Sequence, residues 1–378
     1  MNINEDDMAG SRMHNTRHKI FTYILKCEGK CSKQSIAKDL GHSLPTVYKN
    51  IEQLKEEGFI EYTGLLDSTG GRKASQISVI SNARISIGIY FTNHHLRFIA
   101  ADLYNHEMAY KTMRHFMINN IDDITSYLSN ELETFIDEFS LNRKALLGVG
   151  LAIPACISAD RKKLIMAATL NVHDLPLSDI TDAIPYDMFI DNDARCAGLA
   201  EWYLTDEKNN LAYILLNNGV GGSLICNGVP YLGDDNRGAE FGHMTLVPDG
   251  KACLCGKQGC FEAYCSALRL TDDLGIDIED FFDGLHNDNA KYQHIWNDYL
   301  FYLTHAVNNI HMMFDCDVVL GGMVSPFIRP YLDDIQNTCA CLNSFEHRGD
   351  YLGLSSITSN SVLLGIALHF TKAFLDEF

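Results

Sequence analysis

The sequence predicts a small, mostly helical N-terminal domain followed by a larger body of layered α/β architecture. Three observations lead to this prediction. Basic side chains gather near the N-terminus, because residues 1–78 carry a net charge of +1 and the remaining residues carry −20. Apolar residues between positions 18 and 58 repeat at helical spacing. From residue 84 onward, β-type runs alternate with helical runs. A length of 378 residues allows two or three such domains.

The N-terminal domain has the spacing of a helix-turn-helix. A first amphipathic helix is expected around residues 18–27. Ser32 is the expected N-cap of a second helix, and Gly41 permits the tight turn that follows it. Ser43 then caps a third helix that has a proline in its first turn. In a helix-turn-helix this last helix offers the polar residues of its N-terminal half to base edges in the major groove.

DNA contacts are expected from that helix and from the hairpin after it. Thr46, Tyr48, Lys49 and Asn50 are predicted on its exposed side. Residues 59–80 predict two strands around a glycine-rich tip, a wing whose cations would contact phosphate or the minor groove. The predicted DNA-binding residues are Ser43, Thr46, Tyr48, Lys49, Arg72 and Lys73. The alternative is a three-helix subdomain with no role in DNA binding.

The body is predicted to alternate strands and helices, with residues 68–83 as the linker that precedes it. The expected strands cover residues 85–91, 96–104, 145–155, 188–192, 212–228 as a hairpin, and 317–323. The expected helices cover residues 121–139, 193–205, 260–275, 291–314 and 326–343. In such architectures ligands bind at the ends of strands.

Composition excludes several classes of protein. No apolar run reaches the roughly 18 residues that a membrane-spanning helix needs, and the first ten residues lack the apolar core of a signal peptide. We therefore expect a cytoplasmic protein whose twelve cysteines are thiols or metal ligands rather than disulfides. A net charge of −19 argues against a protein that coats nucleic acid over its whole surface, but it allows one basic module.

A compact cysteine cluster predicts a metal site. Cys253, Cys255 and Cys260 form a C-x-C-G-x-x-G-C run, with glycines where the backbone must turn tightly. His243 lies ten residues before the first cysteine and completes a closed tetrahedral set suited to one structural zinc ion per chain. The alternative is a group of free buried thiols. A metal here would hold the neighbouring Glu240 and Glu262 in one place.

Two further motifs carry weaker predictions. Asn192 and Asp193 stand where a strand gives way to a helix, and together they could bind a diol, although such residues are more often helix caps. The glycine-rich turns at 218–222 and 321–322 could admit a phosphate close to the backbone, or they could be ordinary tight turns.

Together these segments resemble the ROK family (repressors, open reading frames and sugar kinases), and the resemblance covers nearly all of the chain. It implies a two-lobed actin-like ATPase (ribonuclease H-like) fold after a winged helix like that of the N-acetylglucosamine- and xylose-repressor branch. The implied domains are residues 1–78, a first lobe of residues 84–190 with the helix 361–378, and a second lobe of residues 191–360 with the zinc site and a dimerisation surface. The resemblance places sugar contacts at Asn192, Asp193, Glu240, His243 and Glu262.

One departure from the family pattern decides the expected function. ROK kinases carry an Asp-x-Gly-Gly-Thr phosphate loop in the first hairpin, but here Tyr90 stands for the aspartate, Thr92 and Asn93 for the glycines, and His94 for the threonine. Asp193, at the position of the kinases' catalytic base, would then only bind a sugar hydroxyl.

These observations predict a sugar-responsive transcriptional regulator without kinase activity, and a repressor rather than an activator. It would bind a pseudo-palindromic operator as a homodimer, or a homotetramer, and take a small neutral sugar as effector. The alternatives are an active sugar kinase with an added DNA-binding domain, and a zinc–thiol redox switch.

Overall fold

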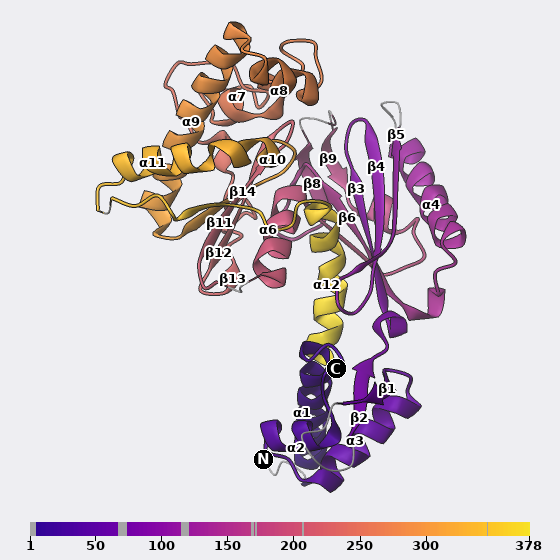
Figure 1. The fold of residues 1–378 in the computed structure, drawn as a ribbon. Helices are drawn as coiled ribbons and strands as arrows, with labels where there is room; N and C mark the ends of the chain where they lie inside the picture. The colour runs from indigo at the N-terminus through magenta and orange to yellow at the C-terminus, as the bar shows by residue number, and fades with distance from the viewer. Residues whose placement is uncertain are drawn as a thin grey trace.

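The computed structural model describes residues 5–66, 74–114, 121–167, 170, 172–205, 208–345 and 347–378. Its side chains are described from residue 16 onward, apart from those of residues 121–123. The predicted fold class is confirmed, because a winged helix-turn-helix precedes a two-lobed α/β body (Figure 1). None of the helices in these ranges is long and apolar enough to cross a membrane.

The N-terminal domain consists of three helices and a hairpin. Its elements are α1 (Glu5–Lys26), α2 (Lys33–Leu40), α3 (Leu44–Glu56), β1 (Ile60–Leu65) and β2 (Ser75–Val79). The predicted caps are present: the Ser32 side chain accepts from the Ser35 amide, and Gly41 ends α2 in the left-handed region with φ of 66°. The tip of the wing, with Arg72 and Lys73, lies outside the described residues.

The first lobe is built on a five-stranded sheet in the order β10-β6-β3-β4-β5. Its strands are β3 (Ile85–Phe91), β4 (His95–Ala101), β5 (Glu107–Arg114), β6 (Leu146–Ile153) and β10 (Met188–Asn192). Between β6 and β10 the chain forms a small antiparallel sheet and a short helix: β7 (Cys156–Ile157), β8 (Lys163–Ala167), β9 (Val172–Pro176) and α5 (Ser178–Thr181). Helix α4 (Ile121–Glu138) covers the outer face, where Phe135 stacks on Phe98 of β4.

The second lobe has a sheet in the order β13-β12-β11-β14-β15 with helices on its outer side (Figure 1). The strands are β11 (Leu211–Leu216), β12 (Val220–Cys226), β13 (Val229–Pro230), β14 (Asp317–Gly321) and β15 (Leu352–Leu354). The helices are α7 (Glu262–Cys265), α8 (Ile278–His286), α9 (Ala290–Phe314), α10 (Ser325–Ile328) and α11 (Leu332–Leu342).

Two helices pack between the lobes. Helix α6 (Asp193–Leu204) and helix α12 (Ser361–Glu377) cross in backbone contact at Gly365, where a Cβ atom would lie 1.8 Å from the carbonyl oxygen of Cys196. Apolar residues of both lobes, among them Ile99 and Leu215, join these helices in one buried cluster. The relative position of the lobes is therefore set by packing on a shared helix pair.

The far end of α12 belongs to the core of the winged helix (Figure 1). Phe378 stacks on Phe21 of α1 with ring centroids 4.3 Å apart, and it meets Phe59 edge-on at 4.9 Å. Phe374 approaches Phe59, whose ring also lies under the guanidinium of Arg84. One helix thus connects the junction of the two lobes to the DNA-binding domain.

The structure corrects two predicted helices. The helix predicted at 260–275 is wrong beyond Cys265, because the amide of Ala267 donates to the Asn217 carbonyl instead of continuing the helix. The segment 326–343 is divided into α10, a 3₁₀ turn at Arg329–Tyr331 and α11, since Pro330 cannot continue an α-helix. Helix α8 and strands β5, β7, β8, β9, β13 and β15 were not predicted.

Candidate functional site

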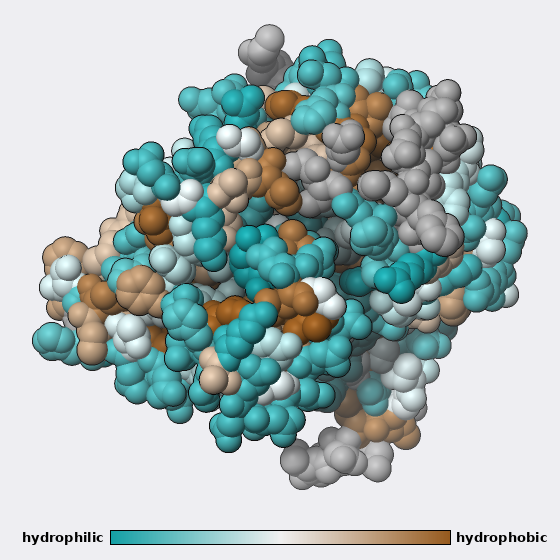
Figure 2. Space-filling model, turned by 90° about the horizontal axis from the view of Figure 1, so that it is seen from above, coloured by the Kyte–Doolittle hydropathy of each residue, from teal (hydrophilic) through white to brown (hydrophobic). Residues whose placement is uncertain are grey.

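A cavity of about 420 Å³ lies between the lobes, within the size range of small-molecule sites. Figure 2 shows the upper face of the molecule as mostly hydrophilic, with a hollow between the second lobe on the left and the first lobe on the right. All five residues predicted to contact a ligand line the cavity: Asn192, Asp193, Glu240, His243 and Glu262. Glu240 and His243 are exposed, whereas Asp193 is buried.

The strand–helix junction at β10 and α6 presents Asn192 and Asp193 to this cavity. Asn192 is the N-cap of α6, because its side-chain oxygen accepts from the Arg195 amide at 3.1 Å and its amide donates to the Ala155 carbonyl. Asp193 begins the helix, where the positive end of the helix dipole stabilises a carboxylate. Capping does not exclude the predicted diol contact, because each side-chain oxygen of Asn192 and Asp193 keeps a second lone pair.

Tyr90 makes a buried contact that ties the first sheet to this junction. Its hydroxyl donates to Oδ2 of Asp193 at 2.8 Å, and Oδ1 accepts from the Ala194 amide. Burial raises the pKa of the Asp193 carboxyl to about 6, although the hydrogen bond from Tyr90 acts in the opposite direction. Tyr90 therefore holds the Asp193 side chain in place.

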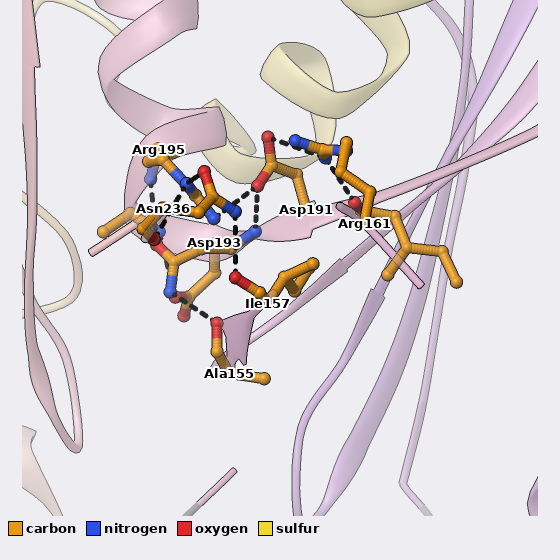
Figure 3. A network of polar contacts seen from close by, with 10 residues as sticks. Ala155, Ile157, Arg161, Asp191, Asp193, Arg195 and Asn236 are labelled. Atoms are coloured by element: carbon orange, nitrogen blue, oxygen red, sulfur yellow. Dashed lines mark hydrogen bonds and ion pairs between the residues drawn. The ribbon is translucent and has the colours of Figure 1, made fainter. Parts of the chain in front are cut away.

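A polar network surrounds the strand–helix junction that lines the cavity (Figure 3). Asp191 forms ion pairs with both Arg161 and Arg195, at 3.3 and 2.8 Å. Arg195 also donates to the side-chain oxygen of Asn236, a buried residue on the loop that leads to Glu240. Asn236 in turn donates to the Ile157 carbonyl at 3.0 Å, so this bond joins the second-lobe loop to the first lobe.

The cysteine motif folds into a cluster that could hold a metal ion. One donor atom from each of His243, Cys253, Cys255 and Cys260 lies within 4.8 Å of every other. The sulfurs of Cys255 and Cys260 are 3.8 Å apart, and Nδ1 of His243 is 3.9 Å from the Cys253 sulfur. Nδ1 therefore faces the cluster, while the residue as a whole lines the cavity.

Glu262 connects this cluster to the second sheet. Its Oε2 accepts from the amide of Val220 at 2.9 Å, and its Oε1 lies 3.5 Å from the sulfur of Cys253. The carboxylate comes so close to the chain at Gly219 that a Cβ atom there would lie 3.0 Å from Oε2. Glycine at position 219 thus leaves room for Glu262 at the cavity wall.

The predicted DNA-binding helix has the expected polarity. Ser43 caps α3, and Ser43, Thr46, Tyr48 and Lys49 are all exposed. The prediction for Asn50 is wrong, because this side chain is buried and donates to the Thr46 carbonyl at 2.9 Å. Lys33 of α2, which the sequence did not indicate, places its ammonium 3.9 Å from the Tyr48 ring centre.

Other cavity residues were also missed. Ile165, Met166 and Leu254 give the cavity an apolar side, and Arg237 adds a cation next to Glu240. Arg237 could have been noticed as the basic residue nearest the Gly-Ala-Glu-Phe-Gly-His motif. The apolar residues carry no local signal, because strand β8 and the metal loop come together only in the folded chain.

A two-lobed body with a cavity between its lobes, joined to a winged helix, defines a DNA-binding protein built on a sugar-kinase-type fold. The model of the ROK family matches residues 87–372, and a model of the winged helix-turn-helix DNA-binding type matches residues 13–61. The chain belongs to the ROK family.

Relatives of known type include both regulators and kinases. The xylose repressor of Bacillus subtilis (strain 168) is 26% identical over 355 residues, which cover 91% of this chain and 92% of the repressor. The DNA-binding transcriptional dual regulator NagC of Escherichia coli (strain K12) is 26% identical over 249 residues, covering 64% of this chain and 60% of NagC. A glucokinase of Halalkalibacterium halodurans is 28% identical over 227 residues, covering 53% and 69%.

Solved structures show the same fold. A ROK family transcriptional regulator described as a homolog of the E. coli MLC protein superposes with a TM-score of 0.75 at 18% identity, covering 96% of this chain and 98% of that chain. A ROK family glucokinase from Streptomyces griseus, in complex with glucose and AMPPNP, gives 0.64 at 18% identity, covering 75% and 98%.

Proposed function

We propose that the chain is a sugar-responsive transcriptional repressor. It binds operator DNA through the winged helix, as a homodimer on a pseudo-palindromic site, and takes a small neutral sugar into the cavity between the lobes. The observation that carries the proposal is that one cavity gathers three carboxylates, two amides and an imidazole, while the chain also carries an intact helix-turn-helix. The repressors among its relatives support the same function.

The cavity suits a sugar because it combines hydrogen-bond acceptors with an apolar side. Asp193, Glu240 and Glu262 can each accept from a ring hydroxyl, and charge-assisted bonds of this kind are the stronger ones. Met166 and Leu254 can cover the C–H face of the ring. Asp193 begins the helix that packs between the lobes, and Glu240 lies on a loop of the second lobe, so a sugar bound to both favours one relative position of the lobes.

The metal is proposed to be a structural zinc ion, one per chain. Zinc–sulfur bonds of about 2.3 Å place neighbouring sulfurs of a tetrahedron roughly 3.8 Å apart, which agrees with the separation of Cys255 and Cys260. When bound, the ion supplies a crosslink between Cys253, Cys255, Cys260 and His243. Four protein donors leave no open position, so its role is to hold the loop that carries Glu240 and Glu262.

The response to sugar follows from differential affinity. A ligand shifts the equilibrium between operator-bound and free protein only through the difference between its binding free energies for the two lobe arrangements. Such couplings are typically about 1–3 kcal/mol. Helix α12 packs at the lobe junction with one end and in the winged helix with the other. A change in lobe position would therefore move the two recognition helices of a dimer out of the spacing of the operator half-sites.

Substitution of Glu240 by alanine is expected to give a repressor that binds operator but ignores sugar. The carboxylate lines the open side of the cavity and forms no ion pair with the described residues, so its loss removes a ligand contact at little cost in stability. Operator affinity should be measured by a gel-shift titration with and without a panel of neutral sugars. The sugar concentration needed to release half of the operator should rise roughly tenfold or more.

The matched control is Asp234→Ala, an exposed carboxylate on the same loop that does not line the cavity. It should respond to sugar like the wild type. If Glu240→Ala still releases operator at the wild-type sugar concentration, this cavity is not the effector site.

Substitution of Asp193 by asparagine is expected to stabilise the fold at neutral pH. The pKa of the Asp193 carboxyl is about 6 in the folded protein, above the ordinary 3.8, so folding favours the protonated form. The contribution of this carboxyl to the free energy of unfolding is therefore complete below pH 4 and is lost as pH rises through 6. At pH 7 the charged form costs up to about 3 kcal/mol. Asparagine avoids this cost, because its oxygen can accept from the Ala194 amide while its NH₂ donates to the Tyr90 oxygen. Thermal melts at pH 4 and 7 should show a gap between the variant and the wild type only at pH 7.

A second candidate function, an active sugar kinase, is favoured by the glucokinase among the relatives. Tyr90 argues against it, because a bulky phenol occupies the side of Asp193 on which a kinase needs a free carboxylate. An assay of ATP consumption across common monosaccharides separates the two functions. Turnover that Asp193→Ala abolishes would establish the kinase instead.

A further inference from the structure

The cavity between the lobes has an apolar wall in addition to its hydrogen-bonding groups. Ile165 and Met166, on strand β8, line it from the first lobe. Leu254 lines it from the second lobe, where it stands between two cysteines of the His–Cys cluster. Met166 is paired with Cys156 across strands β8 and β7, and Cys156 also lines the cavity. Apolar side chains from both lobes therefore line the same cavity.

Leu254 is the most exposed of these side chains. Its exposed fraction is 65%, whereas Ile165 and Met166 are half-buried. Single exposed leucines are common on protein surfaces. Leu254 differs from them because it shares a cavity with other apolar side chains. A ligand that covers this wall gains the free energy of removing its apolar surface from water.

The cavity is larger than one sugar ring requires. Its volume is about 420 Å³. A hexose displaces the liquid volume of about six water molecules, which is roughly 180 Å³ at about 30 Å³ per water. One ring held by the carboxylates therefore leaves room in the cavity for a second unit of similar size.

We propose that the effector is a glycoside, a sugar whose anomeric carbon is linked to a second ring, and that this second ring contacts Met166 and Leu254. The first ring bonds to the carboxylates of Asp193, Glu240 and Glu262, as in the proposed function. The second ring needs an apolar face, which an aromatic ring presents on both sides and a pyranose ring presents through its C–H groups. The inference rests on the proposed function, because it assigns the ligand class of the same cavity.

A second ring also increases the influence of the ligand on the lobes. Met166 belongs to the first lobe and Leu254 to the second, so a ring that contacts both loses one of these contacts when the lobes separate. The difference between the binding free energies for the two lobe arrangements is therefore larger for a glycoside than for its parent sugar. A glycoside should release the operator at lower concentrations.

The test measures operator release from the full-length protein in gel-shift titrations. The probes are glucose, galactose, mannose and xylose, each as the free sugar and as the methyl and phenyl glycosides of both anomers. Cellobiose, maltose, lactose and xylobiose are the disaccharide probes. At least one phenyl glycoside or disaccharide should release half of the operator at a concentration about tenfold or more below that of its parent sugar. The methyl glycoside, which lacks the second ring, should not share this advantage.

Two variants test the apolar wall, one in each lobe. Leu254→Ser and Met166→Gln replace an apolar side chain by a polar one, and each should reduce the tenfold advantage of the extended probe to about threefold or less. Met166→Gln tests the wall away from the metal, which the neighbours of Leu254 are proposed to bind. Leu232→Ser is the matched control, because Leu232 is an exposed leucine of the second lobe that does not line the cavity. It should keep the wild-type ratio.

The ligand class and the proposed function can fail separately. The glycoside proposal is overturned if a free monosaccharide acts at concentrations as low as those of every glycoside and disaccharide, or if both variants keep the wild-type ratio. In these cases the proposed function stands as long as Glu240→Ala weakens the response to the monosaccharide. If no probe releases the operator, or if Glu240→Ala responds like the wild type, the proposed function fails and the glycoside proposal with it.

The two classes of extended probe identify the second ring. Disaccharides that act at lower concentrations than the phenyl glycosides indicate that the second ring is a sugar. The reverse order indicates an aromatic group. Either order supports the proposal only if Leu254→Ser or Met166→Gln reduces the advantage of that probe over its parent sugar.

Discussion

Replacement of Cys255 by serine should release the metal and abolish the response to sugar. A serine hydroxyl is a poor zinc ligand, and three donors bind far more weakly than four in a closed tetrahedral site. Structural zinc contributes apparent free energies of about 10–16 kcal/mol in small zinc-binding peptides, which is comparable to the whole stability of a typical domain, about 5–15 kcal/mol. The loop from Glu240 to Glu262 would therefore lose its order, and with it two walls of the cavity.

The measurement is the zinc content of the purified protein by elemental analysis, together with operator release by sugar. We expect about one zinc per chain in the wild type and much less than one in Cys255→Ser. Cys341→Ser makes the same chemical change at an exposed free thiol on α11 and should alter neither quantity. A Cys255→Ser protein that keeps a full equivalent of zinc, or a metal-free wild type with complete sugar response, would contradict the assignment.

The redox alternative makes a different prediction for the same cysteines. Thiols bound to zinc should resist titration until a chelator is added, whereas a redox switch requires thiols that react while the protein is native. Thiol titration before and after chelation therefore separates a structural site from a switch.

The winged helix could be predicted almost element by element because its determinants are local. Ser32, Gly41 and Ser43 are cap and turn residues whose effect depends only on the few residues around them. The His–Cys cluster that could hold a metal ion was predictable for the same reason, since three of its four residues lie within eight positions. Asn50 was misplaced because its hydrogen bond to the Thr46 carbonyl makes burial of an amide inexpensive, which helical spacing alone does not indicate.

Contacts between distant segments could not be predicted. The helix expected at 260–275 ends early because a tertiary hydrogen bond from Ala267 to Asn217 competes with the helical one. Tyr90 was recognised as a departure from the family pattern, but nothing in the sequence indicates that it hydrogen-bonds to Asp193, 103 positions away. Asn236 matters through hydrogen-bond partners that come together only in the folded chain.

The contact between α12 and the winged helix leads to the last prediction, that Phe378→Ala should weaken operator binding. The Phe378 ring stacks on the fully buried Phe21 and meets Phe59 edge-on. Loss of a fully buried phenylalanine costs about 3–5 kcal/mol, and because Phe378 is half-buried we expect roughly 1–3 kcal/mol here. The cost falls on the N-terminal domain, so that domain should melt first while the body keeps its zinc and its ability to bind sugar.

Two measurements test this coupling. Lys372→Ala, at an exposed ion pair on the same helix, is the matched control and should shift the melting temperature very little. Operator affinity should fall for Phe378→Ala and not for the control, while zinc content should remain the same in both. An isolated fragment of residues 1–78 should be less stable than the same domain in the whole chain, because it exposes Phe21 and Phe59 where α12 now covers them. If the fragment and the full-length domain melted together, α12 would be a passive neighbour, and lobe movement could not reach the DNA-binding domain through it.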